Sequence, residues 1–127
     1  MGRRRRRCER LQLRVLWPRL DSVFFRAVGP EEHADWRACG TLRAMHGGLE
    51  GKHFWGTAEH AAAYARMSRA FGDRGPFHVM SVRFRRGTPV PCYEKNQDLI
   101  GPAYFVDEDA LECIEEIVDL GTVSEAP

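Results

Sequence analysis

Long hydrophobic runs are missing from this sequence. Hydrophobic residues make up 43% of its 127 residues, yet no stretch reaches the roughly 18 consecutive apolar residues that a membrane-spanning helix needs. The arginines near its start are not followed by the apolar core of a signal peptide. We therefore expect a soluble protein without a membrane span, and the length fits a single domain.

The sequence also lacks the familiar strings of catalytic and metal-binding residues. It has no G-x-x-x-x-G-K-S/T, no G-x-G-x-x-G, no H-E-x-x-H and no G-x-S-x-G. Its five histidines show no metal-ligand spacing with acids, so we expect no metal. Its cysteines are too far apart for a C-x-x-C motif, and we expect small buried side chains, with one or two disulfides as the alternative, at Cys8, Cys39, Cys92 and Cys113.

The net charge of +1 conceals an uneven distribution. The first twenty residues hold eight arginines and one glutamate, whereas the remainder holds 11 basic and 17 acidic residues. We expect residues 1–20 to be a solvated, disordered arm, because runs of like charge are usually disordered. The alternative is that this arm binds phosphate backbones or acidic membranes.

Helices are expected in the first half of the chain. Residues 22–28 are β-branched and aromatic, which indicates a strand. Pro30 suits the first position of a following helix, and Gly40 suits its end. Residues 53–55 predict a short strand. Thr57 is a good N-cap for an alanine-rich helix over residues 58–70, which contains no glycine or proline.

Strands are expected in the second half. Residues 77–84 alternate between two faces, and residues 103–106 and 114–120 supply further apolar strands. Asp107 and Asp109 are suitable caps for a brief helical turn through Leu111. Early helices and late strands favour an α+β fold, with a small mixed or antiparallel sheet and helices at one side. We place one domain at residues 21–121 and a tail at residues 122–127.

A glycine-led strand followed by a helix with a tyrosine is the most informative segment. Residues 51–55 read Gly-Lys-His-Phe-Trp, and Tyr64 stands eleven residues after His53. This layout places an aromatic ring beside a bare strand backbone, which suits stacking on a flat heterocycle. Arg26 interrupts an otherwise apolar strand, and a ligand anion is one reason for an arginine there. An outward-pointing Arg26 is the alternative.

Residues 51–64 resemble the central segment of the ADP-ribosyltransferases, in the poly(ADP-ribose) polymerase branch. There a glycine-lysine-led strand precedes a helix with Ala-X-Tyr, and the paired aromatics stand eleven residues apart. The resemblance implies that Tyr64 stacks on nicotinamide. It also implies that the strand lines a cleft for NAD through Gly51, His53, Phe54 and Trp55. The sequence departs from this branch at His53 and Trp55, where the branch prefers tyrosine and alanine.

The first strand carries a second resemblance. Its Phe-Phe-Arg-Ala-Val sequence at residues 24–28 is similar to the opening strand of the arginine-type transferases, which include many bacterial toxins. There the arginine holds phosphate or ribose oxygens of NAD, and the resemblance implies this role for Arg26. Residues 100–104, Ile-Gly-Pro-Ala-Tyr, are similar to a segment of toxin domains at the C-terminal end of large secreted bacterial repeat proteins.

Enzymes of this family carry an acid at the start of a late strand. The acid stabilises the positive charge that develops on the ribose as nicotinamide leaves. Glu94, Asp98 and Glu108 are the candidates, and Asp98 is the first choice because it leads from a polar loop into apolar residues. A glutamate is usual at this place. The sequence departs from that pattern, with an aspartate at Asp98 or Gln97 acting instead. The alternative is that Asp98 is a turn residue.

The resemblance implies an NAD-dependent mono-ADP-ribosyltransferase with an ADP-ribosyltransferase-like fold, as a bacterial toxin or effector domain. Its acceptor would be protein, nucleic acid or water, and an immunity protein would be a further partner. Secretion and action in a target cytoplasm go with this class. Two alternatives stay open. One is a ribonuclease-like toxin that uses His53, His60 or His78 as acid and base, and the other is a non-catalytic binding module.

Overall fold

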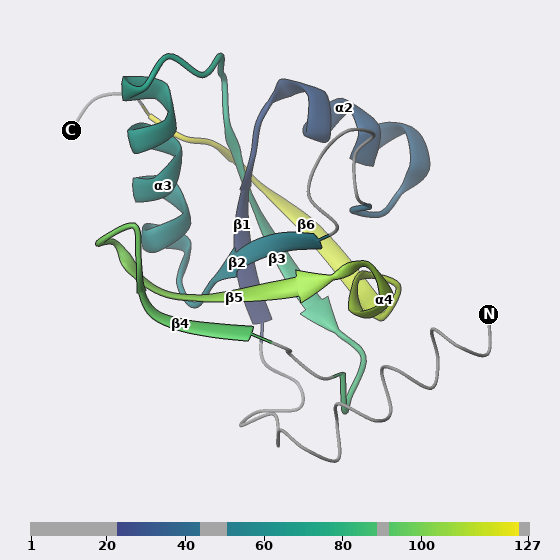
Figure 1. Ribbon diagram of the computed structural model, residues 1–127. Helices are drawn as coiled ribbons and strands as arrows, with labels where there is room; N and C mark the ends of the chain where they lie inside the picture. The colour runs from purple at the N-terminus through teal and green to yellow at the C-terminus, as the bar shows by residue number, and fades with distance from the viewer. Residues whose placement is uncertain (1–22, 44–50, 89–91, 125–127) are drawn as a thin grey trace.

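The computed structural model describes residues 23–43, 51–88 and 92–124 (Figure 1). The predicted basic arm, residues 1–20, lies outside the described residues, as does the end of the predicted tail. The elements follow one another in the order β1 (Val23–Val28), α2 (Pro30–Cys39), β2 (Gly51–Trp55), α3 (Ala58–Ala70), β3 (His78–Phe84), β4 (Cys92–Gln97), β5 (Gly101–Asp107), α4 (Glu108–Leu111) and β6 (Ile114–Thr122). None of the helices in these ranges is long and apolar enough to cross a membrane.

The six strands form one sheet in the order β4-β5-β2-β1-β3-β6. Every recorded strand pair is antiparallel, so the fold is α+β as predicted, with an antiparallel sheet. Strands β1 and β2 share a single register position, Phe25 opposite Trp55, whereas β1 pairs with β3 along its whole length. In Figure 1, β1 and β3 lie roughly vertically, in opposite directions, while β2, β5 and β4 lie across the view. The sheet therefore has two halves that separate beyond Phe25 and Trp55.

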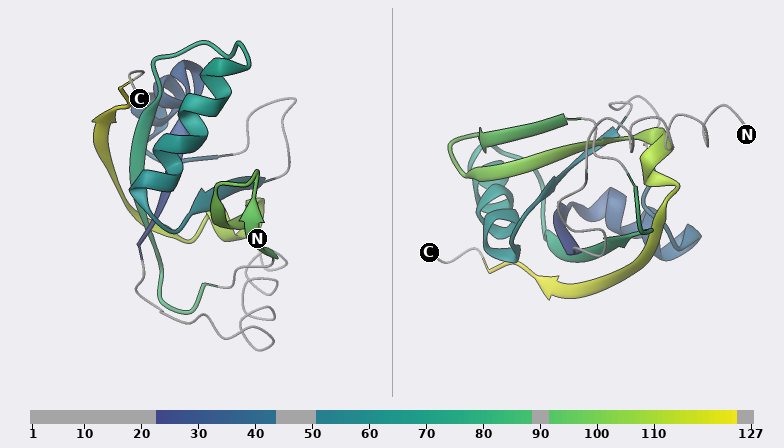
Figure 2. Two further views of the ribbon diagram at one scale, coloured as in Figure 1. Left: turned by 90° about the vertical axis from the view of Figure 1, so that its left-hand side faces the viewer. Right: turned by 90° about the horizontal axis from the view of Figure 1, so that it is seen from below.

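The helices cover both faces of the sheet, which corrects the expectation that they lie at one side. One face packs on α3 and buries a cluster that includes Ala27, Trp55 and Ala61. The other face packs against α2 and α4 and buries Phe54 and Met80, among others. The views in Figure 2 show the strong curvature of the sheet, with β4 and β5 on one side and β6 on the other when seen from below.

Helices α2 and α3 begin and end at the residues that the sequence predicts. Pro30 opens α2, and Gly40 ends it with φ at 81°, a conformation that favours glycine. Helix α3 occupies the predicted residues 58–70, and the Thr57 side chain accepts a hydrogen bond from the His60 N–H at 3.0 Å. Small residues of α3, Ala61 and Ala65, are buried against the sheet, because they let the helix axis approach the strands closely.

Three features of the second half differ from the sequence-based expectations. Strand β4 lies in residues that we expected to form a polar loop, and its side chains from Tyr93 to Asn96 are exposed. Asp98 does not start a strand but lies in the turn between β4 and β5. The sheet also passes the predicted domain boundary at residue 121, because β6 ends at Thr122 and the Val123 N–H donates to the Phe77 carbonyl at 2.8 Å.

Candidate functional site

A pocket of about 270 Å³ lies where β1, β2, α3 and the β4–β5 turn meet. These elements are far apart in sequence, and they meet because β5 pairs with β2 and α3 packs on β1. Seven of the eight predicted site residues line this pocket together with Ala27 and Lys52; the seven are Arg26, Gly51, His53, Trp55, Tyr64, Gln97 and Asp98.

Phe54 is the predicted site residue that does not line the pocket. Its side chain is completely buried, in edge-to-face contact with Phe84 at 5.3 Å between ring centroids. Side chains alternate along a strand, so Phe54 points to the face opposite that of His53 and Trp55. The expectation that Phe54 contacts NAD is therefore corrected: it is a core residue.

Arg26 is held in a fixed position by groups of the protein itself. Its Nε and Nη2 donate to the two carboxylate oxygens of Glu32 at 2.6 and 2.8 Å, in a bidentate pair. Its Nη1 donates to the backbone carbonyl of His53 at 2.8 Å. These bonds use three of the five N–H groups of the guanidinium. The anion that explains an arginine in this strand is therefore Glu32 of α2 in the first instance.

Lys52 joins the same ionic group. Its Nζ lies 3.2 Å from Glu32 Oε2, and its side chain is only 5% exposed. Burial raises the pKa of Glu32, but the hydrogen bonds and charges of Arg26 and Lys52 outweigh this effect, so the pKa lies below its usual value. Burial and the charge of Arg26 lower the pKa of Lys52 more than Glu32 raises it. Two cations thus share one carboxylate beside the pocket.

The aromatic wall of the pocket has two layers. Tyr64 of α3 lies against Trp55 of β2, with 5.7 Å between ring centroids and 36° between the ring planes. Trp55 is almost completely buried, at 2% exposure, whereas Tyr64 is half-buried. Trp55 therefore packs against Tyr64 from the core side, and the exposed part of the Tyr64 ring can stack on a flat ligand.

The floor of the pocket at Gly51 has no room for a side chain. A Cβ at this position would lie 2.3 Å from the Val106 carbonyl oxygen and 2.7 Å from the Phe105 ring of the paired strand. The bare backbone that the sequence predicts at this point is therefore required by the packing of β2 on β5.

Asp98 enters the pocket from a strained turn. Asp98 and Leu99 have φ angles of 54° and 61°, and the Ile100 N–H donates to the Gln97 carbonyl at 2.9 Å. Positive φ at both central residues is typical of a type I′ turn, which normally contains glycine or asparagine. Asp98 is exposed, and its carboxylate accepts a hydrogen bond from Gln97 Nε2 at 3.3 Å. The turn thus brings both predicted catalytic side chains to one wall of the pocket.

His53 is half-buried between these groups. Burial, followed by the charge of Arg26, lowers its pKa from the ordinary value of 6.5, and the carboxylate of Asp98 opposes this only in part. The imidazole is therefore neutral near pH 7. Its ring packs edge-to-face on Phe105, at 5.1 Å between centroids.

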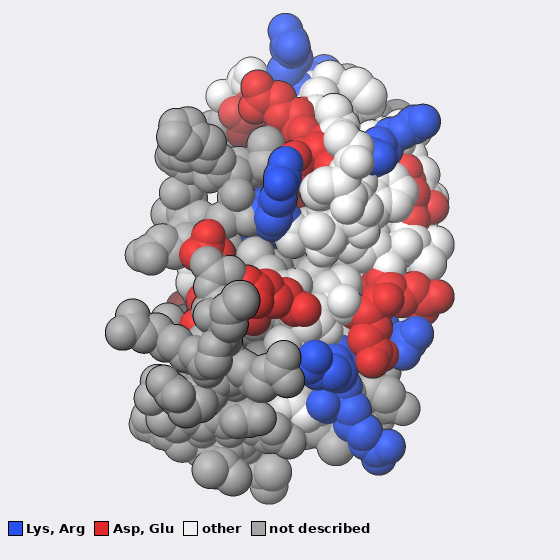
Figure 3. Space-filling view, turned by 90° about the vertical axis from the view of Figure 1, so that its right-hand side faces the viewer, with Lys and Arg blue, Asp and Glu red and all other residues white. Residues whose placement is uncertain are grey.

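The other candidates lie elsewhere. Glu94 and Glu108 are exposed and do not line the pocket. The three histidines of the ribonuclease hypothesis occupy separate settings: His53 lines the pocket, His60 packs under Gly101, and His78 contacts Asp119. Acidic and basic side chains of the described residues are interspersed on the face seen in Figure 3, so this face carries no broad basic surface in the described ranges.

Sequence reasoning missed Glu32 and Lys52, which fix Arg26. A lysine inside a short strand with two large aromatic residues was the available signal for Lys52. Nothing local marks Glu32, because two adjacent glutamates in a first helical turn are ordinary.

Comparisons of this chain with protein-family models, with curated proteins and with solved structures found no match.

Proposed function

We propose that this chain is an NAD-dependent mono-ADP-ribosyltransferase of the toxin or effector type. The observation that supports it is the convergence of residues from four separate parts of the fold on one pocket. These are Arg26 of β1, three predicted residues of β2 (Gly51, His53 and Trp55), Tyr64 of α3 and Asp98 of the β4–β5 turn. The resemblance assigns these groups to different parts of NAD.

The pocket would hold the nicotinamide and its ribose rather than all of NAD. Its volume of about 270 Å³ lies just below the roughly 300–1,000 Å³ of pockets for drug-sized ligands. Tyr64 would stack on the nicotinamide ring, and the backbone at Gly51 would lie along its edge. The two N–H groups of Arg26 not used by Glu32 and His53 would donate to ribose or phosphate oxygens. The adenosine half would extend outside the pocket.

In the proposed reaction, the bond between the nicotinamide nitrogen and ribose C1′ breaks, and its electron pair leaves with neutral nicotinamide. Positive charge then develops on the ribose carbon, and the carboxylate of Asp98 stabilises it. An oxygen or nitrogen nucleophile of the acceptor completes the transfer and loses its proton. Neutral His53 adds no positive charge beside the ribose cation.

Nicotinamide release and transfer of labelled ADP-ribose from NAD to extract proteins or nucleic acid test the proposal. We expect Asp98→Asn to lower turnover by a factor of about 10²–10³, as removal of one electrostatic group at a reacting centre commonly does. Glu94→Gln is the matched control, because Glu94 is an exposed acid on the neighbouring strand outside the pocket. Absence of nicotinamide release, together with no effect of NAD on the melting temperature, would refute the proposal.

A binding module without turnover is the second candidate. Two observations favour it: Glu32 already pairs with Arg26, and Asp98 is exposed at a turn rather than buried at a strand end. This candidate predicts that NAD raises the melting temperature while no nicotinamide is released. It also predicts that Asp98→Asn changes neither result, which separates it from the transferase.

A further inference from the structure

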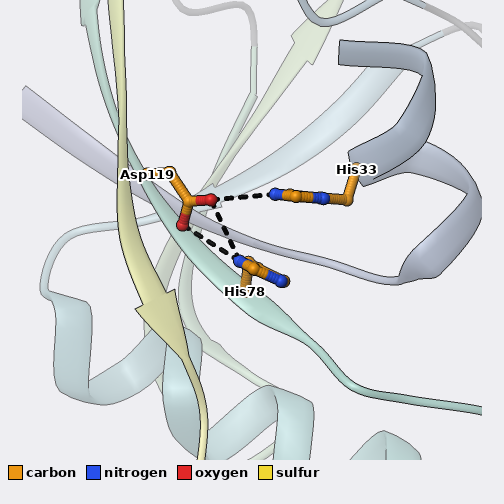
Figure 4. A group of neighbouring side chains, drawn as sticks. All are labelled: His33, His78 and Asp119. Atoms are coloured by element: carbon orange, nitrogen blue, oxygen red, sulfur yellow. Dashed lines mark hydrogen bonds and ion pairs between the residues drawn. The ribbon is translucent and has the colours of Figure 1, made fainter. Parts of the chain in front are cut away.

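A second group of polar side chains lies outside the NAD pocket. His33 of α2, His78 of β3 and Asp119 of β6 come from three elements and meet at one point (Figure 4). Their donor atoms all lie within 4.8 Å of one another. None of these residues lines the NAD pocket.

The contacts within this cluster are short and directed at one carboxylate. His33 Nε2 lies 2.8 Å from Asp119 Oδ2, and His78 Nδ1 lies 3.0 Å from both oxygens of Asp119. The two imidazole rings are stacked, with 3.7 Å between centroids and 20° between planes. Figure 4 shows that each ring directs one nitrogen at the carboxylate. Three donor atoms thus face a common centre.

The surrounding chain holds each donor in place. The pairing of β3 with β6 shifts register between His78 and Met80: these residues oppose Thr122 and Asp119, so β6 contributes one extra residue there. A bulge of this kind re-aims side chains and is frequent beside functional sites. The Gly121 N–H donates to Asp119 Oδ1 at 2.8 Å, and the Trp36 ring packs on His33 at 5.5 Å between centroids. Both contacts orient a donor from outside the cluster, as supporting groups do around metal ligands.

We propose that His33, His78 and Asp119 form a binding site for a divalent transition-metal ion of the zinc class. Two imidazole nitrogens and one carboxylate are typical ligands of zinc and its neighbours, whereas magnesium and calcium take oxygen ligands. This proposal differs from the sequence-based expectation of no metal. The argument for the metal site does not rest on the proposed NAD chemistry.

The spacing needs only a small change to admit an ion. With metal bonds of about 2.0–2.2 Å, two donors of a tetrahedral site lie roughly 3.3–3.6 Å apart. The nitrogen–oxygen distances are now 2.8 and 3.0 Å, so side-chain rotations that open them by well under 1 Å are sufficient. Each neutral imidazole then carries its proton on the nitrogen that faces away from the ion.

The bound ion would keep one coordination position open to solvent and would join two parts of the fold. The three side chains are 14%, 19% and 25% exposed, which leaves the cluster accessible to an ion and to a water as a further ligand. Coordination would join α2 to the β3–β6 edge of the sheet. Glu32, which holds Arg26 at the NAD pocket, is the residue next to His33 on α2. The metal would therefore also restrain the helix that positions Arg26.

Titration of the full chain, first stripped with a chelator, tests the site. Isothermal titration with Zn²⁺ should give one equivalent bound through this cluster, and the melting temperature should rise with zinc concentration. Mg²⁺ should have no effect. Asp119→Asn should weaken zinc binding more than about a hundredfold, since loss of a supporting group alone costs about 10–100-fold. Glu116→Gln, an exposed acid on the same strand, should bind zinc as the unaltered chain does.

Cobalt provides a readout that needs no variant. Bound Co²⁺ should shift and broaden the ring proton signals of His33 and His78 in NMR spectra, without a cobalt–thiolate charge-transfer band. A thiolate band would assign the metal to the cysteines and overturn the proposal. Unchanged histidine signals, or zinc affinity retained in both Asp119→Asn and His33→Ala, would overturn it as well and leave a hydrogen-bonded structural cluster.

Discussion

Replacement of Glu32 by glutamine tests whether the ionic group beside the pocket stabilises the fold. The change keeps the volume and one acceptor oxygen but removes the charge that faces Arg26 and Lys52. Those two side chains are 19% and 5% exposed, so they would remain as neighbouring, poorly solvated cations. Breaking one partner out of a buried ionic group typically costs about 3–5 kcal/mol. We expect the lower end, about 3 kcal/mol, because glutamine still accepts one hydrogen bond.

The effect should be large in a thermal melt. A domain of this size loses about 4 °C in melting temperature for each kcal/mol, so a loss of about 3 kcal/mol in Glu32→Gln should lower the melting temperature by roughly 12 °C. Glu31→Gln is the matched control. Glu31 is exposed and also lies in the first turn of α2, so both variants lose the same favourable interaction with the helix dipole. The difference between the two variants therefore reports the ionic group alone.

A double-mutant cycle with Lys52→Met completes the test. Glu32 compensates the buried charge of Lys52. In the absence of Glu32, Lys52→Met should therefore recover part of the stability lost in Glu32→Gln, with a coupling energy between the two residues of about 1 kcal/mol or more. Urea unfolding followed by circular dichroism measures all four chains. The reasoning is refuted if Glu32→Gln lies within about 0.5 kcal/mol of Glu31→Gln, a difference typical of exposed ion pairs.

Three further predictions concern the pocket and the turn beside it. Gly51→Ala should destabilise the fold by more than about 2 kcal/mol in urea unfolding, since its Cβ would lie 2.3 Å from the Val106 carbonyl oxygen. Gly56→Ala is the control, because a Cβ there meets nothing within 4 Å, and its unfolding free energy should stay near that of the unaltered chain. Leu99→Gly should raise the melting temperature slightly, because relief of the positive φ gains about 1 kcal/mol; a lower value would contradict strain in the turn. The pKa of His53 lies lower in the folded chain than in the unfolded chain, so the unfolded chain binds a proton there more readily. His53 therefore adds to the unfolding free energy in full above pH 6.5, and this contribution is lost as the pH falls through the lowered pKa. His53→Gln should remove this pH-dependent contribution. The unfolding free energy of the unaltered chain minus that of the variant, measured between about pH 5 and 8, should rise with pH, and a flat difference would contradict it.

Most of the fold could be predicted because its signals are local. Helix α3 follows from a cap at Thr57 and an uninterrupted helix-forming composition, and the alternation of residues 77–84 corresponds to β3 (His78–Phe84). Strand β4 was missed because it lies at the edge of the sheet, where exposed polar residues form a strand through pairing with β5 alone. No local pattern distinguishes such a strand from a polar loop.

In the candidate site, too, some residues could be predicted from local sequence and others could not. Its lining residues could be chosen from the sequence, because a glycine, an aromatic ring and an arginine in unusual settings each have a local signature. Their partners could not, since the contacts of Glu32 with Arg26 and Lys52 depend on how α2 crosses the sheet. The same holds for Asp119, which stands 86 residues from His33 in sequence. Contacts between distant segments arise only from the packing of whole elements.

Arg26 illustrates why residue type alone does not define a role. Strands β1 and β2 pair at Phe25 and Trp55 and then separate, so the His53 carbonyl, which faces β1, accepts from the Arg26 side chain instead of a backbone N–H. An unsatisfied carbonyl there would cost about 1–3 kcal/mol. The same guanidinium holds Glu32 and therefore α2. Arg26 therefore joins α2 and β2 through its own hydrogen bonds and also lines the pocket. One side chain can do all of this because a planar guanidinium donates hydrogen bonds in several directions at once.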